Sequence, residues 1–195
     1  MDDRLIRLLE KLQHVENEVL HEIQRKEQEF FYQILKKKVR FEQDAKKAHK
    51  DLIKKIHHYL RDASIKNILT APIIWSCLIP ALLMDLVISM FQGVCFPVYG
   101  IPKVRRSDYI IIDRQYLNYL NRIERLNCVY CGYFNGVIGY SREVAGRAEQ
   151  YWCPIKHARK IKSIHSRYKN FFDYGDAAGY REKIEEVRRG FDDID

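Results

Sequence analysis

The sequence predicts a mainly α-helical fold, and three observations support this prediction. Residues 1–71 contain no glycine and no proline, the two residues that are least favourable inside helices. Residues 68–101 carry a single formal charge, Asp85, so a long apolar segment follows. Helical composition returns after residue 113, around a group of cysteines. We therefore divide the chain into residues 1–66, 67–102 and 103–195.

Residues 1–66 are predicted to form one long helix. Apolar side chains recur there every eleven residues in two rows: Leu8, Val19, Phe30, Phe41 and Leu52, and Leu12, Ile23, Ile34, Ala45 and Ile56. Eleven residues make three helical turns at about 3.67 residues per turn, so each row stays on one side of the helix. A stripe of this kind needs a partner, and pairing as a coiled coil in a homo-oligomer would supply one. The alternative is a helical hairpin that reverses near residues 36–38.

Residues 67–102 are predicted to contact a lipid bilayer. The apolar run from Ile68 to Ile101 exceeds the roughly 20 residues that a membrane-crossing helix needs. A single span is one arrangement, and a membrane-embedded helical hairpin bent near Pro80 is the other. Basic residues balance on the two sides of the run, so the positive-inside rule selects no orientation for a span. A buried core helix of a soluble oligomer would have a similar composition.

Polar residues inside this run are predicted to face protein. Asp85 falls near its middle, where a charge costs about 2.5–3.5 kcal/mol in a bilayer. Ser89 and Gln92 follow at i+4 and i+7, so the three side chains share one face of a helix. Three aromatic residues suit the membrane interfaces: Trp75, Phe96 and Tyr99.

Residues 103–195 are predicted to form a small helical domain. Residues 109–112 read as an extended segment, and Asp113 can cap a helix over residues 114–126. A basic helix is expected over 157–168. The last helix is expected from Ala177 to Arg189, ended by Gly190, with a frayed tail after it.

Four residues in this domain have the spacing of metal ligands. Cys128, Cys131, Cys153 and His157 follow the pattern C-x2-C-x21-C-x3-H. Three thiolates and one imidazole suit a tetrahedral structural zinc ion. Pro154 suits the first turn of a helix, which would place Cys153 and His157 on one face of it. Iron is the alternative metal, and free thiols are the alternative without one.

The metal interpretation depends on how residues 133–152 fold. Their composition from Asn135 to Trp152 is helical, and one unbroken helix there would hold Cys131 and Cys153 some 25–30 Å apart. The link must therefore turn back for the four ligands to meet, and Gly136, Gly139 or Gly146 could break it.

Two resemblances attach to these residues. The run Cys-Val-Tyr-Cys-Gly-Tyr at 128–133 and the Cys153-Pro154 pair resemble the two knuckles of rubredoxin-type sites, with His157 where those sites have cysteine. Residues 70–180, with Ile-Pro-Lys at 101–103 and Tyr-Trp-Cys-Pro-Ile-Lys-His at 151–157, resemble a family of uncharacterised bacterial membrane-associated proteins. The second resemblance implies a bacterial inner membrane, with the Cys/His domain in the cytoplasm, and implies no activity.

The charge favours an anionic partner. The formal net charge is +8, and a basic protein is attracted to nucleic acid or to the anionic cytoplasmic leaflet. The basic residues are spread along the chain and match no nucleic-acid-binding module, so we expect the lipid bilayer as partner. No small-molecule substrate is evident.

These observations predict a non-enzymatic function. We interpret the chain as a membrane-associated structural or interaction protein with a zinc-stabilised cytoplasmic domain. One alternative is a redox or electron-transfer protein that uses Cys128 and Cys131, through iron or a disulfide at a helix start. A remoter alternative is a hydrolase that depends on Cys153, because Cys153 and Arg159 have the C-x5-R spacing of a phosphatase loop.

Overall fold

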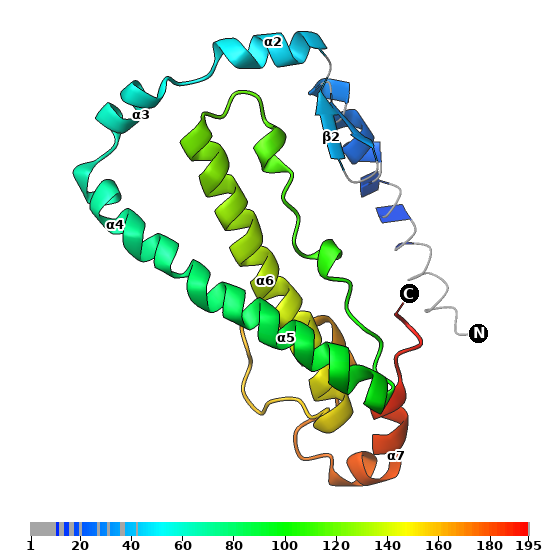
Figure 1. The fold of residues 1–195 in the computed structure, drawn as a ribbon. Helices are drawn as coiled ribbons and strands as arrows, with labels where there is room; N and C mark the ends of the chain where they lie inside the picture. Colours follow the sequence, from blue (N-terminus) through cyan, green and yellow to red (C-terminus); the bar gives the residue numbers. More distant parts are fainter. Residues whose placement is uncertain are drawn as a thin grey trace. The chain divides into compact units, whose positions relative to one another are not determined.

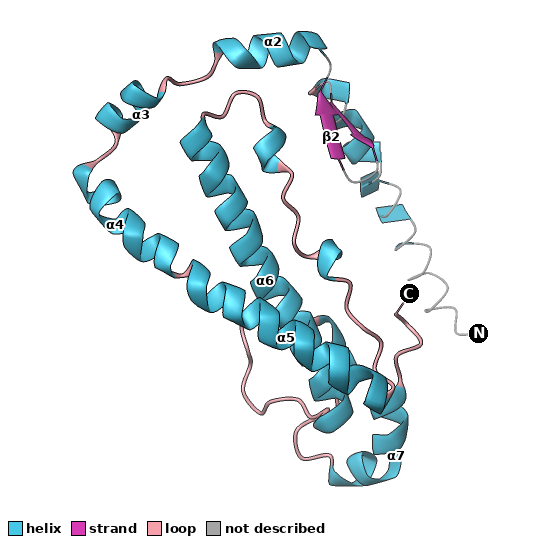
Figure 2. Cartoon of the chain, viewed as in Figure 1, coloured by secondary structure: helices cyan, strands magenta, loops and turns pink. Residues whose placement is uncertain are grey.

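The fold was analysed in a computed structural model of the chain. It describes residues 43–194 without interruption and, before them, residues 11, 14–15, 18–19, 21–26, 28–30, 32–35 and 38–41. Helices dominate this part of the chain (Figure 2), as the sequence predicts. The chain divides into two compact units. The first joins the described part of residues 1–62 to 113–126, and the second joins 63–112 to 127–194.

The predicted continuous helix over residues 1–66 is wrong. The described residues between 11 and 29 are helical, but β1 (Tyr32–Leu35) and β2 (Lys38–Phe41) form an antiparallel hairpin, with Leu35 opposite Lys38. The chain thus reverses where the alternative placed a helical turn, but it does so between strands. Half of the strand residues are aromatic or β-branched, types that favour strands: Tyr32, Ile34, Val39 and Phe41. Ile34 and Phe41, one from each eleven-residue row, lie in these strands, while Leu8 and Leu12 lie outside the described residues.

Two short helices follow the hairpin. They are α2 (Gln43–Asp51) and α3 (Ile56–Asp62), separated by a loop over residues 53–55. Leu52 and Ile56 therefore do not continue one helical stripe. Residues 1–71 contain no glycine or proline that would break a helix, but this absence does not by itself make a long helix. Helices as short as α2 and α3 take most of their stability from packing.

The apolar segment folds as α4 (Ile65–Ser76) and α5 (Leu78–Tyr99). Cys77 between them keeps right-handed helical angles, φ −63° and ψ −14°. Together they make one apolar helical stretch of 35 residues (Figure 1). The predicted hairpin bent near Pro80 is therefore wrong. Pro80 falls in the first turn of α5, where proline removes no helical hydrogen bond.

The longest helix is α6 (Arg122–Trp152). The predicted helix over 114–126 is shifted, because Asp113 precedes only the short 3-10 turn η2 (Arg114–Tyr116). Asn121 caps α6 instead. Its Oδ1 accepts from the backbone N–H groups of Ile123 and Glu124, and the Glu124 carboxylate accepts from the Asn121 N–H, which makes a capping box.

After α5, residues 100–112 run back along α5 and α6, and we call them the returning segment. Gly100 ends α5 in a left-handed conformation, φ +69°, so the chain can reverse there. It continues through the 3-10 turn η1 (Arg106–Asp108). Gly136 of α6 lets it approach closely, because a Cβ there would lie 2.8 Å from the Ile110 Cα. The second unit thus packs α5, residues 100–112 and α6 from Asn127 onwards against one another (Figure 1).

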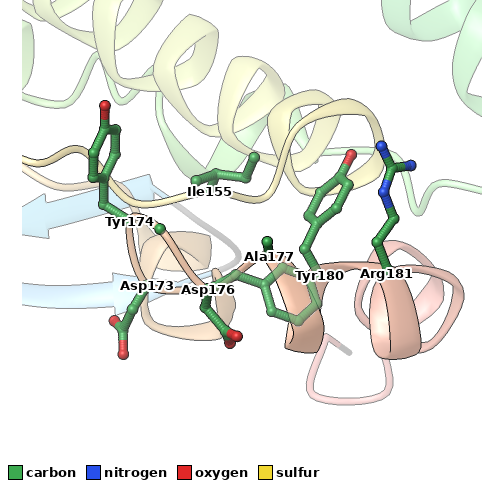
Figure 3. Close-up of a pocket in the computed structure, with 9 residues that line it drawn as sticks. Ile155, Asp173, Tyr174, Asp176, Ala177, Tyr180 and Arg181 are labelled. Atoms are coloured by element: carbon green, nitrogen blue, oxygen red, sulfur yellow. The ribbon is translucent and has the colours of Figure 1, made fainter.

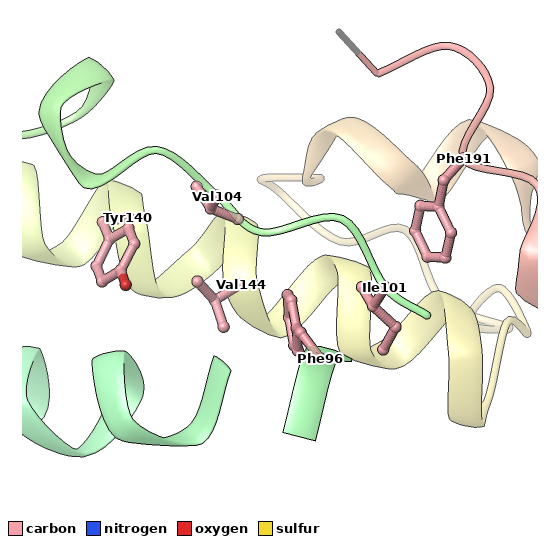
Figure 4. Packing of buried hydrophobic residues seen from close by; sticks show 6 residues of the cluster. All are labelled: Phe96, Ile101, Val104, Tyr140, Val144 and Phe191. Atoms are coloured by element: carbon pink, nitrogen blue, oxygen red, sulfur yellow. The ribbon is translucent and has the colours of Figure 1, made fainter. Parts of the chain in front are cut away.

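The hydrophobic core lies at this junction (Figure 4). Phe96 of α5 and Val144 of α6 are fully buried, and the returning segment adds Val104. Phe191, beyond the last helix, packs on the same cluster, which also includes Ile101 and Tyr140. The prediction that Phe96 lies at a membrane interface is therefore wrong.

The C-terminal part follows the end of α6. Residues 157–168 are not the predicted basic helix: they form an irregular loop that leads into the 3-10 turn η3 (Ser166–Asn170). Helix α7 (Ala177–Arg189) and its end before Gly190 confirm the prediction. The tail is held down, because Arg167 Nη1 bonds Asp193 Oδ1 at 2.8 Å and Ile194 packs on the core.

Candidate functional site

Helix α5 has its polar side buried and its apolar side exposed. Asp85 and Gln92 are each 8% exposed, and Ser89 is half-buried. The exposed positions carry only aliphatic, methionine, glycine or proline residues: Ile79, Pro80, Leu82, Leu83, Leu86, Val87, Met90, Gly93, Val94, Pro97 and Val98. They cover roughly half of the helix circumference at 100° per residue. We call these eleven residues the outer face. A helix on the surface of a soluble protein has the opposite polarity.

Asp85 is the centre of the buried polar side. Arg106 donates from Nε to Oδ1 at 3.0 Å and from Nη2 to Oδ2 at 2.5 Å, so the pair is bidentate. The Tyr133 hydroxyl of α6 donates to Oδ2 at 2.8 Å, and Ser89 reaches Oδ1 at 3.4 Å. Three side chains, one each from α5, residues 100–112 and α6, thus surround one carboxylate. This confirms that Asp85 and Ser89 face protein.

The charges in this cluster are fixed. The hydrogen-bonded Asp85 carboxylate raises the pKa of Arg106 above its ordinary value, so the guanidinium keeps its proton. Burial raises the pKa of Tyr133, and the hydrogen bond to Asp85 raises it further. Tyr133 therefore stays a neutral donor. Such a site can join three segments, and it offers no group poised for proton transfer near neutral pH.

Gln92 forms a second junction two turns further along α5. Its Oε1 accepts from the Val104 N–H at 2.9 Å, and its Nε2 donates to the Val104 carbonyl at 3.2 Å. The same nitrogen donates to the Tyr140 hydroxyl at 2.6 Å. Gln92 therefore pairs both backbone polar groups of Val104 in the returning segment. Burying these two groups without hydrogen-bond partners would be costly.

A third junction attaches the C-terminal part to α6. Gln150 is fully buried and donates to the carbonyls of Val187 and Gly190 at 2.9 and 2.8 Å. Its Oε1 accepts from Arg167 Nε at 2.6 Å, and Arg167 Nη2 also bonds the Gly190 carbonyl. One amide and one guanidinium thus connect α6, η3 and the end of α7.

The four predicted metal ligands are not brought together. Cys128 and Cys131 lie inside the unbroken helix α6, while Cys153 and His157 follow its end. At 1.5 Å per residue, Cys131 and Cys153 are about 33 Å apart along the axis. Pro154 follows the end of α6 and begins no helix. Among the residues that the structure describes, no group of three or more His, Cys, Asp or Glu side chains could hold a metal ion.

The glycines did not break α6 because tertiary packing stabilises them. Gly132, Gly136 and Gly146 are all buried in α6. A Cβ on Gly146 would meet the His165 ring at 2.6 Å, and one on Gly136 would meet the backbone of Ile110. Close neighbours offset the low helix propensity of glycine.

None of Cys128, Cys131 and Cys153 lies at a helix N-terminus, one of the settings in which reactive thiols occur. Cys128 and Cys131 lie inside α6, and Cys153 follows its C-terminal end. All five cysteines are free thiols, and Cys77, Cys131 and Cys153 are exposed.

A shallow cavity of about 320 Å³ lies beside the start of α7 (Figure 3). Phe172 and Tyr180 form part of its wall, with their ring centroids 5.6 Å apart. Its two acidic residues already have structural roles. Asp176 caps α7 by accepting from the Gly179 N–H, and Asp173 pairs with Lys156 at 2.8 Å. We therefore place no chemistry in this cavity.

Sequence reasoning missed the partners of Asp85. The sequence pattern does not single out Tyr133 or Arg106 as a partner of Asp85. One signal was present: a lone acid in an apolar run needs a cation, and Lys103, Arg105 and Arg106 follow directly. The spacing does not say which of the three pairs.

No protein-family model, curated protein or solved structure matches this chain. The resemblances to rubredoxin-type knuckles and to a bacterial membrane-associated family therefore stay predictions from the sequence.

Proposed function

We propose that this chain is a membrane-associated structural protein, in which α4 and α5 contact lipid and hold the rest of the second unit at the membrane. The outer face of α5 is the observation that carries the proposal. The apolar helical stretch is long enough to cross a bilayer, yet only 11% of its most apolar 18-residue segment is buried. The core helix of a soluble protein would be mostly buried.

The polar junctions support a structural role. Asp85 and Gln92 join α5 to residues 100–112 and to α6 through charge-assisted and backbone hydrogen bonds. These bonds fix the rest of the second unit to α5, the helix proposed to contact lipid. The membrane of a bacterial cell, with residues 103–195 on the cytoplasmic side, remains the proposed location.

Flotation with lipid vesicles tests the proposal. Full-length protein is mixed with sealed vesicles of phosphatidylcholine and a minority of phosphatidylglycerol and centrifuged through a density gradient. We expect the protein to rise with the vesicles. Protein that stays at the bottom without detergent, as a stable soluble oligomer, would overturn the proposal.

A matched pair of variants locates the contact. Leu86→Gln with Met90→Gln makes two outer-face positions polar, at residues that are 58% and 61% exposed. Tyr174→Gln is the control, since Tyr174 is 70% exposed but lies outside α5. The double variant is expected to bind vesicles roughly 10- to 100-fold more weakly, because it loses apolar area and places two amides in lipid. The control is expected to bind like the unaltered chain.

A further inference from the structure

We infer that α5 lies in the plane of one leaflet and does not cross the bilayer. This inference rests on the proposed function and adds the geometry of the contact. The partner is a lipid bilayer with anionic headgroups, contacted by the outer face of α5. The rest of the second unit lies on the aqueous side.

Two clusters of aromatic side chains mark where a membrane-crossing helix would meet the two membrane interfaces. Trp75 pairs with Tyr130 near the end of α4, with ring centroids 5.1 Å apart. At the other end Tyr99 contacts Tyr151 and Trp152, each at 5.1 Å. Trp75 and Tyr99 are about 36 Å apart along a helix, which matches a hydrocarbon core with its interfaces. A span between these ends is therefore possible by length.

The returning segment is incompatible with that span. Arg106 bonds Asp85, which is roughly midway between Trp75 and Tyr99. The neighbours of Arg106 are exposed: Lys103, Arg105, Ser107 and Asp108. A span would place these charges and their irregular backbone in the hydrocarbon. Irregular backbone is tolerated at that depth only where protein or water covers it.

An orientation within one leaflet satisfies both sides of α5. Its outer face enters the acyl layer, where in-plane helices bury their apolar side by about 5–10 Å. Its polar side, with Asp85 and Gln92, faces the second unit and water. The charge is complementary to anionic headgroups, because the returning segment is basic and the loop after Trp152 adds Lys156, Arg159, Lys160 and Lys162.

Two native cysteines test the inference in the unaltered chain. Cys77 lies next to the Trp75 end and Cys153 next to the Trp152 end, and both are exposed. Protein is bound to the outside of sealed vesicles and treated with a membrane-impermeant maleimide, followed by peptide mass spectrometry. We expect both cysteines to react fully. A span would protect one of them, or about half of each if both orientations occur, and either result would overturn the inference. A membrane-permeant maleimide must label both in every case.

Spin-label depth gives an independent readout. Labels are attached to Ile79→Cys, Leu86→Cys and Val94→Cys in a cysteine-free background, since these outer-face positions are 72%, 58% and 68% exposed. Equal depths for the three labels are expected, whereas a span would place Leu86 about 10 Å deeper than the other two. Circular dichroism checks that the cysteine-free protein keeps its helix content. If the cysteine-free protein does not fold, the native-cysteine experiment decides. Flotation separates the two proposals: protein that floats with one cysteine protected refutes only the in-plane orientation.

Discussion

Arg106 holds both carboxylate oxygens of Asp85, the one formal charge in the apolar run from Ile68 to Ile101. The Asp85 side chain is 11% exposed, and that of Arg106 is 48% exposed. The pair therefore bridges a buried site and the surface. It also fixes the direction of the chain after α5, because Arg106 can reach Asp85 only if residues 100–106 run back along the helix.

Removing Arg106 is expected to destabilise the second unit. Arg106→Gln leaves the Asp85 carboxylate buried with only Tyr133 and Ser89 as donors. Breaking a buried pair costs about 3–5 kcal/mol, but water screens the half-exposed guanidinium, so we expect a loss of about 1–3 kcal/mol. Urea unfolding in detergent micelles measures it.

Arg105→Gln is the matched control, because Arg105 is the exposed neighbour. It should change stability by less than about 0.5 kcal/mol. The double variant Asp85→Asn with Arg106→Gln should recover part of the loss, since no unpaired charge remains. Equal effects of Arg105→Gln and Arg106→Gln would contradict the assigned pairing.

Two glycines of α6 should respond to alanine in opposite directions. A Cβ on Gly136 would lie 2.8 Å from the Ile110 Cα and from the Tyr109 carbonyl oxygen, both of them backbone atoms. Gly136→Ala is therefore expected to destabilise by about 1–3 kcal/mol. A Cβ on Gly139 would meet only the Tyr109 ring, at 3.4 Å. Gly139→Ala is expected to be neutral or to stabilise by up to about 1 kcal/mol, through helix propensity. Thermal unfolding of both variants measures these effects. Stabilisation by Gly136→Ala would contradict the close approach of the Tyr109–Ile110 backbone to Gly136.

Patterns within one element could be predicted from the sequence. The i, i+4, i+7 spacing of Asp85, Ser89 and Gln92 was enough to place them on one face toward protein, and Ala177 with Gly190 marked the ends of α7. The composition of residues 135–152 also indicated the helix that separates Cys131 from Cys153. Each of these depends on helical periodicity or on residues close in sequence.

Contacts between distant segments could not be predicted in this way. Tyr133 and Tyr140 meet α5 across 48 residues in each case, and no local pattern selects them. The structure does not bring the four predicted metal ligands together for the same reason: ligand spacing says nothing about whether the link folds back, and α6 is continuous through it. In residues 1–66 a repeat of apolar positions was compatible with both helix and strand, and β1 and β2 formed where aromatic residues gather.

Metal removal should leave the protein unchanged if α6 is continuous. Cys131 and Cys153 are then about 33 Å apart and cannot share an ion whose bonds to sulfur are about 2.3 Å long. We expect a strong chelator to leave the melting temperature within about 1 °C, and Cys131→Ser and Cys153→Ser to behave alike with and without added zinc. A chelator-induced fall in melting temperature that Cys153→Ser abolishes would restore the four-ligand site.

Acid should loosen the C-terminal tail through Asp193. The hydrogen bond from Arg167, helped by Lys169, lowers the pKa of this carboxyl below its ordinary value. A lowered pKa in the folded state means that the unfolded state binds the proton more tightly. The contribution of Asp193 is therefore fully present above the unfolded pKa of about 3.9, and it is lost as the pH falls through the folded value. Because the Asp193 side chain is 44% exposed, solvent screening keeps this contribution below about 1 kcal/mol.

Asp193→Asn isolates that contribution. The variant should be slightly less stable than the unaltered chain at pH 7, and the two should converge as the pH falls below the folded pKa of Asp193. Urea unfolding over this range measures the difference, and Asp192→Asn is the control, since Asp192 is exposed and adjacent.

Because Arg167 also bonds Gln150 and the Gly190 carbonyl, it keeps its place when Asp193 is protonated. The difference should therefore be confined to the tail, which limited proteolysis at pH 7 would show as faster cleavage after residue 190 in Asp193→Asn. An Asp193→Asn variant whose stability differs from the unaltered chain by the same amount at every pH would show that the Arg167 pair carries no pH-dependent stability.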